Sequence, residues 1–317
     1  MIISRNAAPV LLSALLLAAA GGAAAESGLT GAPILNRPVG ARSSAMGRAF
    51  TAVPGDPEAL LYNPAGLAFV EGFSPHVSYM NGFSGGSYGF LAAPIKFRNF
   101  VLTPAYHYYN SGTISLNLTD GTVGSVTAEL DKVALLSAAY QPAPGLALGV
   151  TLKRLDIDLA ETASADALSV DVGALYRPTS RLSFGAAVLN TGQEIKFEED
   201  ADPSPRALRA GVAYKMVPRK PNFMDPSADI SYSDLLFTAD WSKVIKEDGY
   251  LQAGFEANML LPQRILLSLR AGYLFDREEE GLTFGFGFRS GRWTFAFGFE
   301  TPKKLDARRP VSVTYDF

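Results

Sequence analysis

The sequence has no cysteine and only two histidines, His76 and His107, among its 317 residues. Zinc sites are built mainly from Cys and His, so neither a zinc centre nor thiol chemistry is expected. Lys and Arg number 28 against 31 Asp and Glu, and this balance offers no basic field for nucleic acid. A Ser-His-Asp set, a paired-carboxylate site and a phosphate-binding glycine loop are also missing. The sequence therefore predicts neither an enzyme nor a bound cofactor.

Long apolar runs are missing beyond the N-terminus, so no membrane-spanning helix is expected. The N-terminus itself has Arg5, an apolar run over 10–20 and the small residues Ala23-Ala24-Ala25. This pattern predicts a secretory signal peptide over residues 1–25, cleaved before Glu26. The alternative is an anchoring helix, for which the apolar run is short. We therefore expect the mature chain outside the cytoplasm.

What the sequence does have is alternation of large apolar residues with small or polar ones. In "WTFAFGF", for example, four aromatic residues alternate with Thr294, Ala296 and Gly298. Such a period of two is typical of a β-strand, whose side chains point to opposite faces. About fourteen segments can be read this way: roughly 73–80, 87–95, 99–109, 131–141, 145–155, 167–177, 181–190, 206–216, 235–242, 251–258, 265–273, 282–288, 293–299 and 311–317.

This pattern predicts an all-β fold, a transmembrane antiparallel β-barrel of about 14 strands. Its apolar face would meet lipid, and a closed barrel leaves no strand edge unpaired there. A soluble β-sandwich also alternates, but its solvated face would not hold so many Gly and Ala residues. The chain stops at Phe317, after Tyr315 on the same face of the last segment. This ending resembles the C-terminal signal that the outer-membrane assembly machinery reads.

Several charged residues fall in mid-strand on the small face, which lines the lumen of a barrel. They would form either a polar track and gate or structural charge pairs across a filled lumen. The second interpretation is favoured. The residues are Lys153, Asp171, Arg209, Asp240, Glu256 and Arg270.

The connections predict an orientation. If the first strand rises from the periplasm, the mostly short even-numbered connections lie at the periplasmic rim and the mostly acidic odd-numbered ones lie outside. Two connections fit poorly, because 217–233 is long and 301–310 is basic. The acids of the loops 156–166 and 276–281 would form a solvated rim or, as the less favoured alternative, bind Ca²⁺. They are Asp156, Asp158, Glu161, Asp166, Glu278, Glu279 and Glu280.

The segment before the first strand loses the period of two. Asp56-Pro57-Glu58 predicts the start of a short helix, with an N-cap, a proline and a first-turn carboxylate. This helix should stop at Asn63-Pro64, after which Gly66 frees the chain to turn. Ser43 or Ser44 would cap an earlier helix that reaches about Ala52. A compact segment of this kind fits inside the lumen, as a plug.

The stretch "GARSSAMGRAFTAVPGDPEALLYNPAGLA" resembles the N-terminal hatch signature of the PorV/PorQ-like outer-membrane proteins, which are related to the FadL long-chain fatty acid transporters. The triplet Asn63-Pro64-Ala65 carries the likeness, together with the Gly-Ala-Arg and Met-Gly pieces upstream, and the expected hatch residues also include Gly66 and Gly47. The resemblance implies a fourteen-stranded barrel, a hatch formed by these residues, and roles in transport or secretion. This chain is shorter than the transporters, with little room for outer-loop helices.

The expected organisation is a signal peptide (1–25), a hatch (26–68) and a barrel (69–317) in the bacterial outer membrane. Two classes of function follow: passage of small hydrophobic molecules through a plugged barrel, or a non-transport part in a secretion or cargo-attachment system. Expected partners are the bilayer with its lipopolysaccharide, the assembly machinery, and either a hydrophobic small molecule or secretion-system proteins.

Overall fold

The structure is a computed structural model that describes residues 30–317 except 83–84, 118–122, 161, 198–199, 219–230, 262–263, 278–279 and 303–306. The predicted signal peptide and most of the long 217–233 connection lie outside the described residues. No helix among the described residues has the length and apolarity needed to span a membrane.

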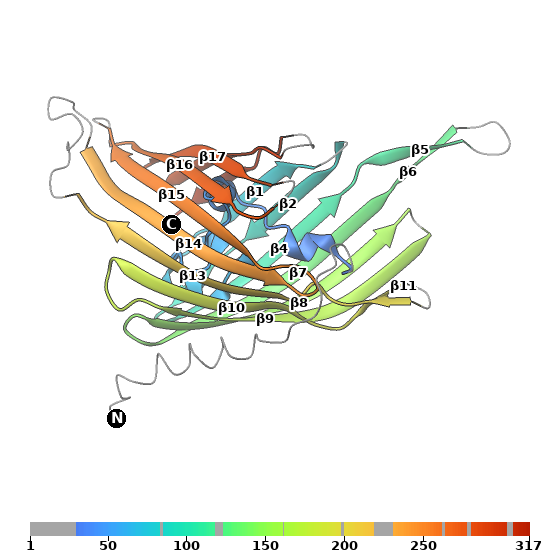
Figure 1. The fold of residues 1–317 in the computed structure, drawn as a ribbon, viewed down its shortest axis with the longest axis horizontal. Coiled ribbons are helices and arrows are strands. Elements are labelled where there is room, and N and C mark those ends of the chain that lie inside the picture. Colours follow the sequence, from blue (N-terminus) through green and yellow to red (C-terminus); the bar gives the residue numbers. More distant parts are fainter. Residues whose placement is uncertain are drawn as a thin grey trace.

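Fourteen antiparallel strands close into a barrel, because β1 pairs with both β2 and β19 (Figure 1). A fifteenth, short strand, β3 (Ile95–Phe97), pairs with β4 beyond the end of β2. The fourteen are β1 (His76–Asn81), β2 (Ser87–Ala92), β4 (Phe100–Asn110), β7 (Glu129–Ala143), β8 (Leu146–Leu159), β9 (Ala163–Tyr176), β10 (Leu182–Gly192), β13 (Ala207–Met216), β14 (Ser231–Val244), β15 (Tyr250–Leu260), β16 (Leu266–Leu274), β17 (Leu282–Ser290), β18 (Trp293–Glu300) and β19 (Val311–Tyr315). Each coincides with a predicted segment, so the predicted fold is confirmed.

The outside of the barrel is apolar, as the alternation predicted. Across β17 and β18, Phe284 stacks on Phe299 and Phe286 on Phe297, with ring centroids 5.1 Å and 5.0 Å apart. The neighbouring glycines and Ala296 face inward and are buried. Exposed aromatic ladders of this kind are stable where the surroundings are hydrocarbon rather than water. We therefore treat the barrel wall as membrane-spanning.

Two short hairpins extend beyond the barrel at one end (Figure 1): β5 (Thr113–Asn117) with β6 (Val123–Thr127), and β11 (Ile195–Phe197) with β12 (Asp200–Asp202). The sequence did not predict them, because they are short and their sheets are separate from the barrel. We call this end, with the connections 245–249, 275–281 and 301–310, the hairpin rim. The other end carries the turns 94–99, 141–145 and 177–181 and the chain end Phe317, and we call it the terminal rim.

The predicted acidic loop 156–166 is wrong, because β8 continues to Leu159 and β9 begins at Ala163. Asp156 and Asp166 are direct partners in this antiparallel pair. The apolar-polar alternation simply continues past the apolar band, with the acids on the outer face. Glu161, Glu278 and Glu279 lie outside the described residues.

Residues 30–70, which we call the inner segment, lie inside the barrel. They form η1 (Pro33–Asn36), α2 (Ala41–Ala45), η2 (Pro57–Leu61) and η3 (Pro64–Phe69). Strands on opposite sides of the barrel contact these elements: α2 packs on β16 to β19, and η3 packs on β4 and β7 to β9. The inner segment therefore crosses the lumen from one wall to the other.

The local predictions for this segment are partly right. Asp56 caps η2 by accepting a hydrogen bond of 2.8 Å from the Glu58 N–H, as predicted. The helix predicted from Ser43 or Ser44 to Ala52 is wrong, because α2 ends at Ala45. Gly47 and Arg48 follow with φ of 62° and 60°, and this left-handed backbone terminates the helix.

The role predicted for Gly66 is also wrong. Gly66 lies within η3 and does not have a positive φ. A Cβ at this position would lie 2.8 Å from the Ala59 Cβ and 3.0 Å from the Val53 carbonyl oxygen. Gly66 is therefore needed for close packing of η3 against η2, rather than for a turn.

The inward glycines of the wall explain how the lumen holds this segment. At eight of them an added Cβ would come within 3.2 Å of an atom of the inner segment, in most cases a backbone atom. We call this set the glycine belt: Gly149, Gly173, Gly185, Gly211, Gly254, Gly272, Gly285 and Gly298. The small inner face seen in the sequence is therefore the contact surface for the inner segment.

Candidate functional site: the inner segment and its path through the barrel

Asn63 fastens the middle of the inner segment to the wall. Its Nδ2 donates hydrogen bonds to the carbonyl oxygens of Thr51, at 2.9 Å, and Ala174, at 3.0 Å. Its Oδ1 accepts one from the Ala65 N–H at 3.1 Å. Gly173 leaves the space into which the Asn63 side chain fits. Pro64, Ala65 and Gly66 follow, all buried, so the predicted Asn63-Pro64-Ala65 triplet lies at the contact between segment and wall.

Replacement of Asn63 by Ala should weaken this attachment by roughly 1–3 kcal/mol, because buried backbone groups lose their partners. Hydrogen exchange within 50–68 should then be faster than in the wild type. Asn81→Ala is the matched control, since Asn81 also bonds two backbone groups, at Ala307 and Arg309, but outside the lumen. Equal protection of 50–68 in Asn63→Ala and the wild type would show that Asn63 does not fasten the segment.

Glu256 on β15 joins the inner segment to the wall by charge. Its Oε1 accepts a hydrogen bond of 2.6 Å from Arg42 of α2, and its Oε2 accepts one of 2.6 Å from Arg270 on β16. Arg42 also pairs with Asp56 at 2.8 Å. A carboxylate buried to this extent, with 2 % exposure, is stable only because both cations are present.

The other sequence-predicted charges form two further pairs. Asp240 accepts a hydrogen bond of 2.8 Å from the Thr51 N–H of the inner segment and lies 3.4 Å from Arg209. Lys153 pairs with Asp171 at 2.7 Å and donates to Asn190, whose amide reaches the Leu35 carbonyl. All six residues are therefore ion-paired inside the barrel, and each group touches the inner segment directly or through one residue.

A further group of charges closes the lumen at the hairpin rim. Arg48 lies 2.7 Å from Glu300 and 3.1 Å from Glu280, and Arg37 lies 2.9 Å from Glu280. Arg308, from the basic connection that fitted the rim poorly, lies 3.3 Å from both glutamates. The rim network consists of Arg37, Arg48, Arg277, Glu280, Glu300 and Arg308.

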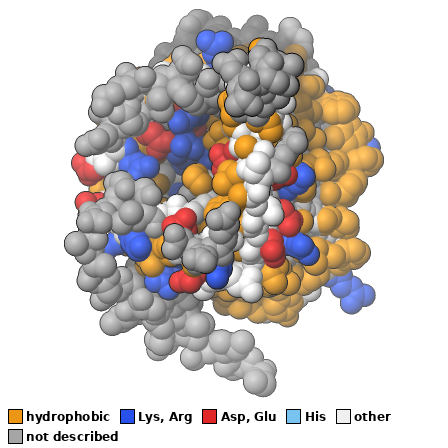
Figure 2. Space-filling model, turned by 90° about the vertical axis from the view of Figure 1, so that its right-hand side faces the viewer, with side chains coloured by type: hydrophobic (Ala, Val, Ile, Leu, Met, Phe, Trp, Pro, Cys, Tyr) orange, Lys and Arg blue, Asp and Glu red, His pale blue; other side chains and the backbone are white. Residues whose placement is uncertain are grey.

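The rim network is ionised at neutral pH. Burial alone would raise the pKa of the Glu280 carboxyl, but the guanidinium groups of Arg48, Arg37, Arg277 and Arg308 outweigh burial and hold that pKa well below its ordinary value. Seen from the hairpin rim, acidic and basic side chains occupy the mouth, while the flank of the barrel is hydrophobic (Figure 2).

The opposite side of the interior is apolar. Buried side chains of β2, β4, β7, β8 and β9 pack with η1 and η3 in one continuous cluster, which we call the apolar path. It extends from Ile195 on the β11 hairpin to Val70, at the end of η3 near the terminal rim. Its wall side chains include Phe90, Val133, Leu135, Leu155, Ile157, Ala165, Ala167 and Leu175.

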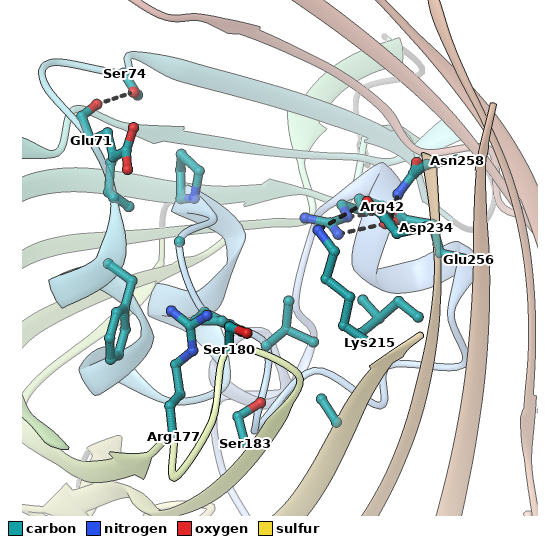
Figure 3. A pocket seen from close by; sticks show the side chains of 18 of the residues that line it. Arg42, Glu71, Ser74, Arg177, Ser180, Ser183, Lys215, Asp234, Glu256 and Asn258 are labelled. Carbon is teal, nitrogen blue, oxygen red and sulfur yellow. Dashed lines mark hydrogen bonds and ion pairs between the residues drawn. The ribbon is translucent and has the colours of Figure 1, made fainter. Parts of the chain in front are cut away.

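A cavity of about 790 Å³ opens below the inner segment at the terminal rim (Figure 3). Arg42 and Glu256 line its inner end, and the guanidinium of Arg177 stacks 4.9 Å from the Phe69 ring centre. Lys215 pairs with Asp234 at 2.9 Å at one side. The cavity is therefore polar, and it begins where the apolar path ends.

The chain end lies at the same rim. β19 stops at Tyr315, two residues earlier than the predicted strand. The Phe317 N–H donates to the Phe73 carbonyl at 3.1 Å, and its ring lies 5.1 Å from the Phe73 ring and 4.7 Å from Tyr315. The Phe317 side chain is 66 % exposed. Phe317 is therefore accessible at the end of the closing strand, beside the half-buried Tyr315.

Known structures have a similar fold. The toluene transporter TodX of Pseudomonas putida matches with a TM-score of 0.57 and 11 % identity, over 87 % of this chain and 97 % of that one. A FadL homologue of Pseudomonas aeruginosa matches with a TM-score of 0.51 and 12 % identity, over 87 % and 98 %. The monoaromatic hydrocarbon channel CymD matches with a TM-score of 0.55 and 12 % identity, over 88 % and 97 %. The chain has a FadL-like fold.

At these identities the likeness establishes the fold alone. No protein-family model matches the sequence. A search of curated proteins gave no match either.

Sequence reasoning missed several residues of the site. Glu58, expected only in the first turn of η2, accepts a hydrogen bond of 2.8 Å from the Ser43 N–H and one of 3.2 Å from Ser312 on β19. Glu300 was also missed, although it continues the inward series of Ala296 and Gly298 on β18. That alternation was the available signal for Glu300. The partner of Glu58 lies 254 residues away, and no local pattern indicates it.

Proposed function

We propose that this protein is a plugged outer-membrane channel for small hydrophobic molecules, in which the inner segment is the hatch. The observation that carries the proposal is the apolar path, one continuous buried cluster from the hairpin rim to η3. Apolar molecules enter such a path at low cost, whereas ions and sugars do not. The hairpin rim would face outside, and the polar cavity would open to the periplasm. The structural neighbours named as a toluene transporter and a monoaromatic hydrocarbon channel agree with this proposal.

The distribution of glycines supports the same side of the barrel as the route. β1, β2, β4 and β7 contain a single glycine, Gly89, which faces the Tyr108 ring rather than the inner segment. On these strands the wall meets the segment through side chains, which can rotate. On β8 to β18 most belt glycines bring the wall against backbone of the inner segment, which cannot yield in the same way. Passage is therefore easier along the β2, β4 and β7 side of the apolar path than past the charged wall.

Entry of a hydrophobic dye, N-phenylnaphthylamine, into intact cells tests the proposal. Cells that make the protein should take up the dye faster than cells without it. Leu155→Ala should increase the rate further, because Leu155 is 1 % exposed in the apolar path and its truncation opens space there. Leu152→Ala is the control, since Leu152 lies on the same strand but is 57 % exposed on the outer face. Uptake equal to that of cells without the protein would contradict a transport role.

A PorV-like part in secretion or cargo attachment is the second candidate. The β5–β6 hairpin favours it, because Ile114 and Val123 are 47 % and 69 % exposed on a hairpin outside the barrel sheet. Exposed apolar side chains on a projecting hairpin suit a protein partner. The dye experiment separates the two candidates, because a secretion component would not change dye entry.

A further inference from the structure

One carboxylate in the wall of the apolar path has no partner. Asp131 points inward from β7 with 0 % exposure, and neither of its oxygens has a hydrogen-bond partner within the described chain. Its neighbours on the adjacent strands are Tyr109 on β4 and Ile157 on β8. A buried carboxylate without donors is costly in such surroundings. The Glu129 carboxyl comes within hydrogen-bonding reach of Asp131, but a carboxylate has no donor to give, so the Asp131 oxygens can accept a hydrogen bond from a ligand.

A second unpartnered group lies in the same wall. His107 is 3 % exposed, and its Nε2 has no hydrogen-bond partner among the described residues. It lies opposite Val133, the next inward residue after Asp131 on β7. The ring of Phe90 meets the imidazole edge-on, with centroids 6.1 Å apart. The wall thus presents an acceptor and an imidazole nitrogen close together, between apolar side chains.

The charges around this position disfavour anions. Glu129 lies two residues before Asp131 on the same face of β7. The two charged side chains on this face of the strand, Glu129 and Asp131, are therefore both acids. The cation on the next strand, Lys153, is held by Asp171 and Asn190. Arg37 and Arg308, the rim-network arginines whose charge reaches Tyr88, are paired with Glu280 and Glu300. A ligand carboxylate would therefore meet two acids and no free cation within the described chain.

The remaining neighbours favour an aromatic ring. Tyr88 and Tyr109 are partners across β2 and β4, and their rings are stacked with centroids 4.4 Å apart. Tyr109 is in turn the direct partner of Asp131. An aromatic body can pack on these rings and on Ile157 while a polar group reaches the carboxylate. A neutral hydroxyl supplies the missing donor without bringing a charge into the apolar path.

We infer that Asp131 is a specificity-determining anchor for phenols, neutral aromatic molecules with a hydroxyl donor, and that it disfavours carboxylate ligands. The hydroxyl donates to the Asp131 carboxylate, His107 lies within the same polar spot, and the ring packs against Tyr88 and Tyr109. This inference rests on the proposed function, since it needs the apolar path to admit ligands. It goes further by naming the polar group that a preferred ligand carries.

Binding of four matched probes to the full-length mature protein in lipid nanodiscs tests the inference by equilibrium dialysis, with binding to empty nanodiscs subtracted. The probes share one apolar body: ethylbenzene, para-ethylphenol, para-ethylbenzoate and para-ethylbenzylammonium. The wild type should bind the phenol about tenfold more tightly than ethylbenzene, the gain expected for one hydrogen bond to a charged group. The benzoate should bind most weakly.

Variants separate the anchor from a structural role. Asp131→Leu should abolish the preference for the phenol, keep the affinity for ethylbenzene and raise the thermal stability, because a costly buried carboxylate is gone. Asp131→Asn keeps an acceptor oxygen and should retain part of the preference. Ser137→Ala is the control, since Ser137 is inward on the same strand and its hydroxyl is already bonded to Val150 and Thr151.

The outcomes distinguish the two proposals. If ethylbenzene binds but the phenol preference persists in Asp131→Leu, the anchor is wrong and the apolar path stands. If the benzoate or the ammonium probe binds more tightly than the phenol, the assigned ligand class is wrong. If no probe binds, the proposed function fails, and the anchor fails with it.

Discussion

Deletion of residues 40–68 should turn a closed barrel into an open pore. The deletion removes α2, η2 and η3, which fill the lumen from β4 round to β19. The wall should survive, because its fourteen strands are joined by closed backbone hydrogen-bond ladders that do not pass through the inner segment. In planar bilayers the baseline of the wild type should be replaced by discrete open steps, and liposomes should swell in small sugars.

Heat-modifiable migration on gels should show that the deleted barrel has assembled. Deletion of 113–127, the projecting β5–β6 hairpin, is the control and should leave conductance at the wild-type level. Conductance unchanged by the 40–68 deletion in an assembled barrel would mean that the segment does not close the lumen. The secretion role would then be favoured over transport.

Gly272→Ala should displace the inner segment with a single methyl group. A Cβ on Gly272 would lie 2.7 Å from the Gly47 Cα, and the other atoms it meets are also backbone atoms of Met46 and Gly47. Backbone cannot rotate away as a side chain does, so the cost should reach or exceed the roughly 1–3 kcal/mol typical of overpacking. We expect a lower melting temperature on heat-modifiable gels and partial leakage of small solutes.

The matched control is Gly281→Ala, seven residues from β16 Leu274 and outside the belt. At Gly281 an added Cβ would meet nothing closer than the Tyr273 ring at 3.7 Å, which is ordinary contact. Its stability and leakage should equal those of the wild type. A Gly272→Ala protein that melts and leaks like the control would show that the glycine belt does not set the position of the segment.

The barrel could be predicted from the sequence because alternation is a local signal. Phe284, Phe286 and Phe288 predict a lipid-facing strand without information from any other part of the chain. The same parity places Lys153, Glu256 and Arg270 inside. The strand ends were harder to predict. At 156–166 the outward side chains change from apolar to acidic, as the outer face passes from hydrocarbon to water, but the pairing of β8 with β9 continues.

The inner segment was harder to predict, because its contacts are distant in sequence. Asp56 and its cap on η2 were readable, since the partner is two residues away. By contrast, the contact between Arg48 and Glu300 joins residues that are 252 positions apart. Arg48 also has a left-handed backbone, which a residue other than glycine rarely adopts, so no local pattern predicted its position. Its neighbour Gly47 marks the turn but does not reveal the partner. The loss of the period of two before the first strand predicted a segment inside the lumen, but not the contacts that hold it there.

The glycine belt also constrains the order in which the protein is made. The inner segment touches the last strand and a distant part of the wall, since the Ala41 N–H donates to Ser312 on β19 and Asn63 reaches Ala174 on β9. Because Gly272 and Gly298 leave no space for a side chain next to the segment, we expect the segment to be in place before β19 joins β1, rather than to enter a finished barrel. The part of the chain that closes the lumen would then also serve as the template on which the last strands of the wall close.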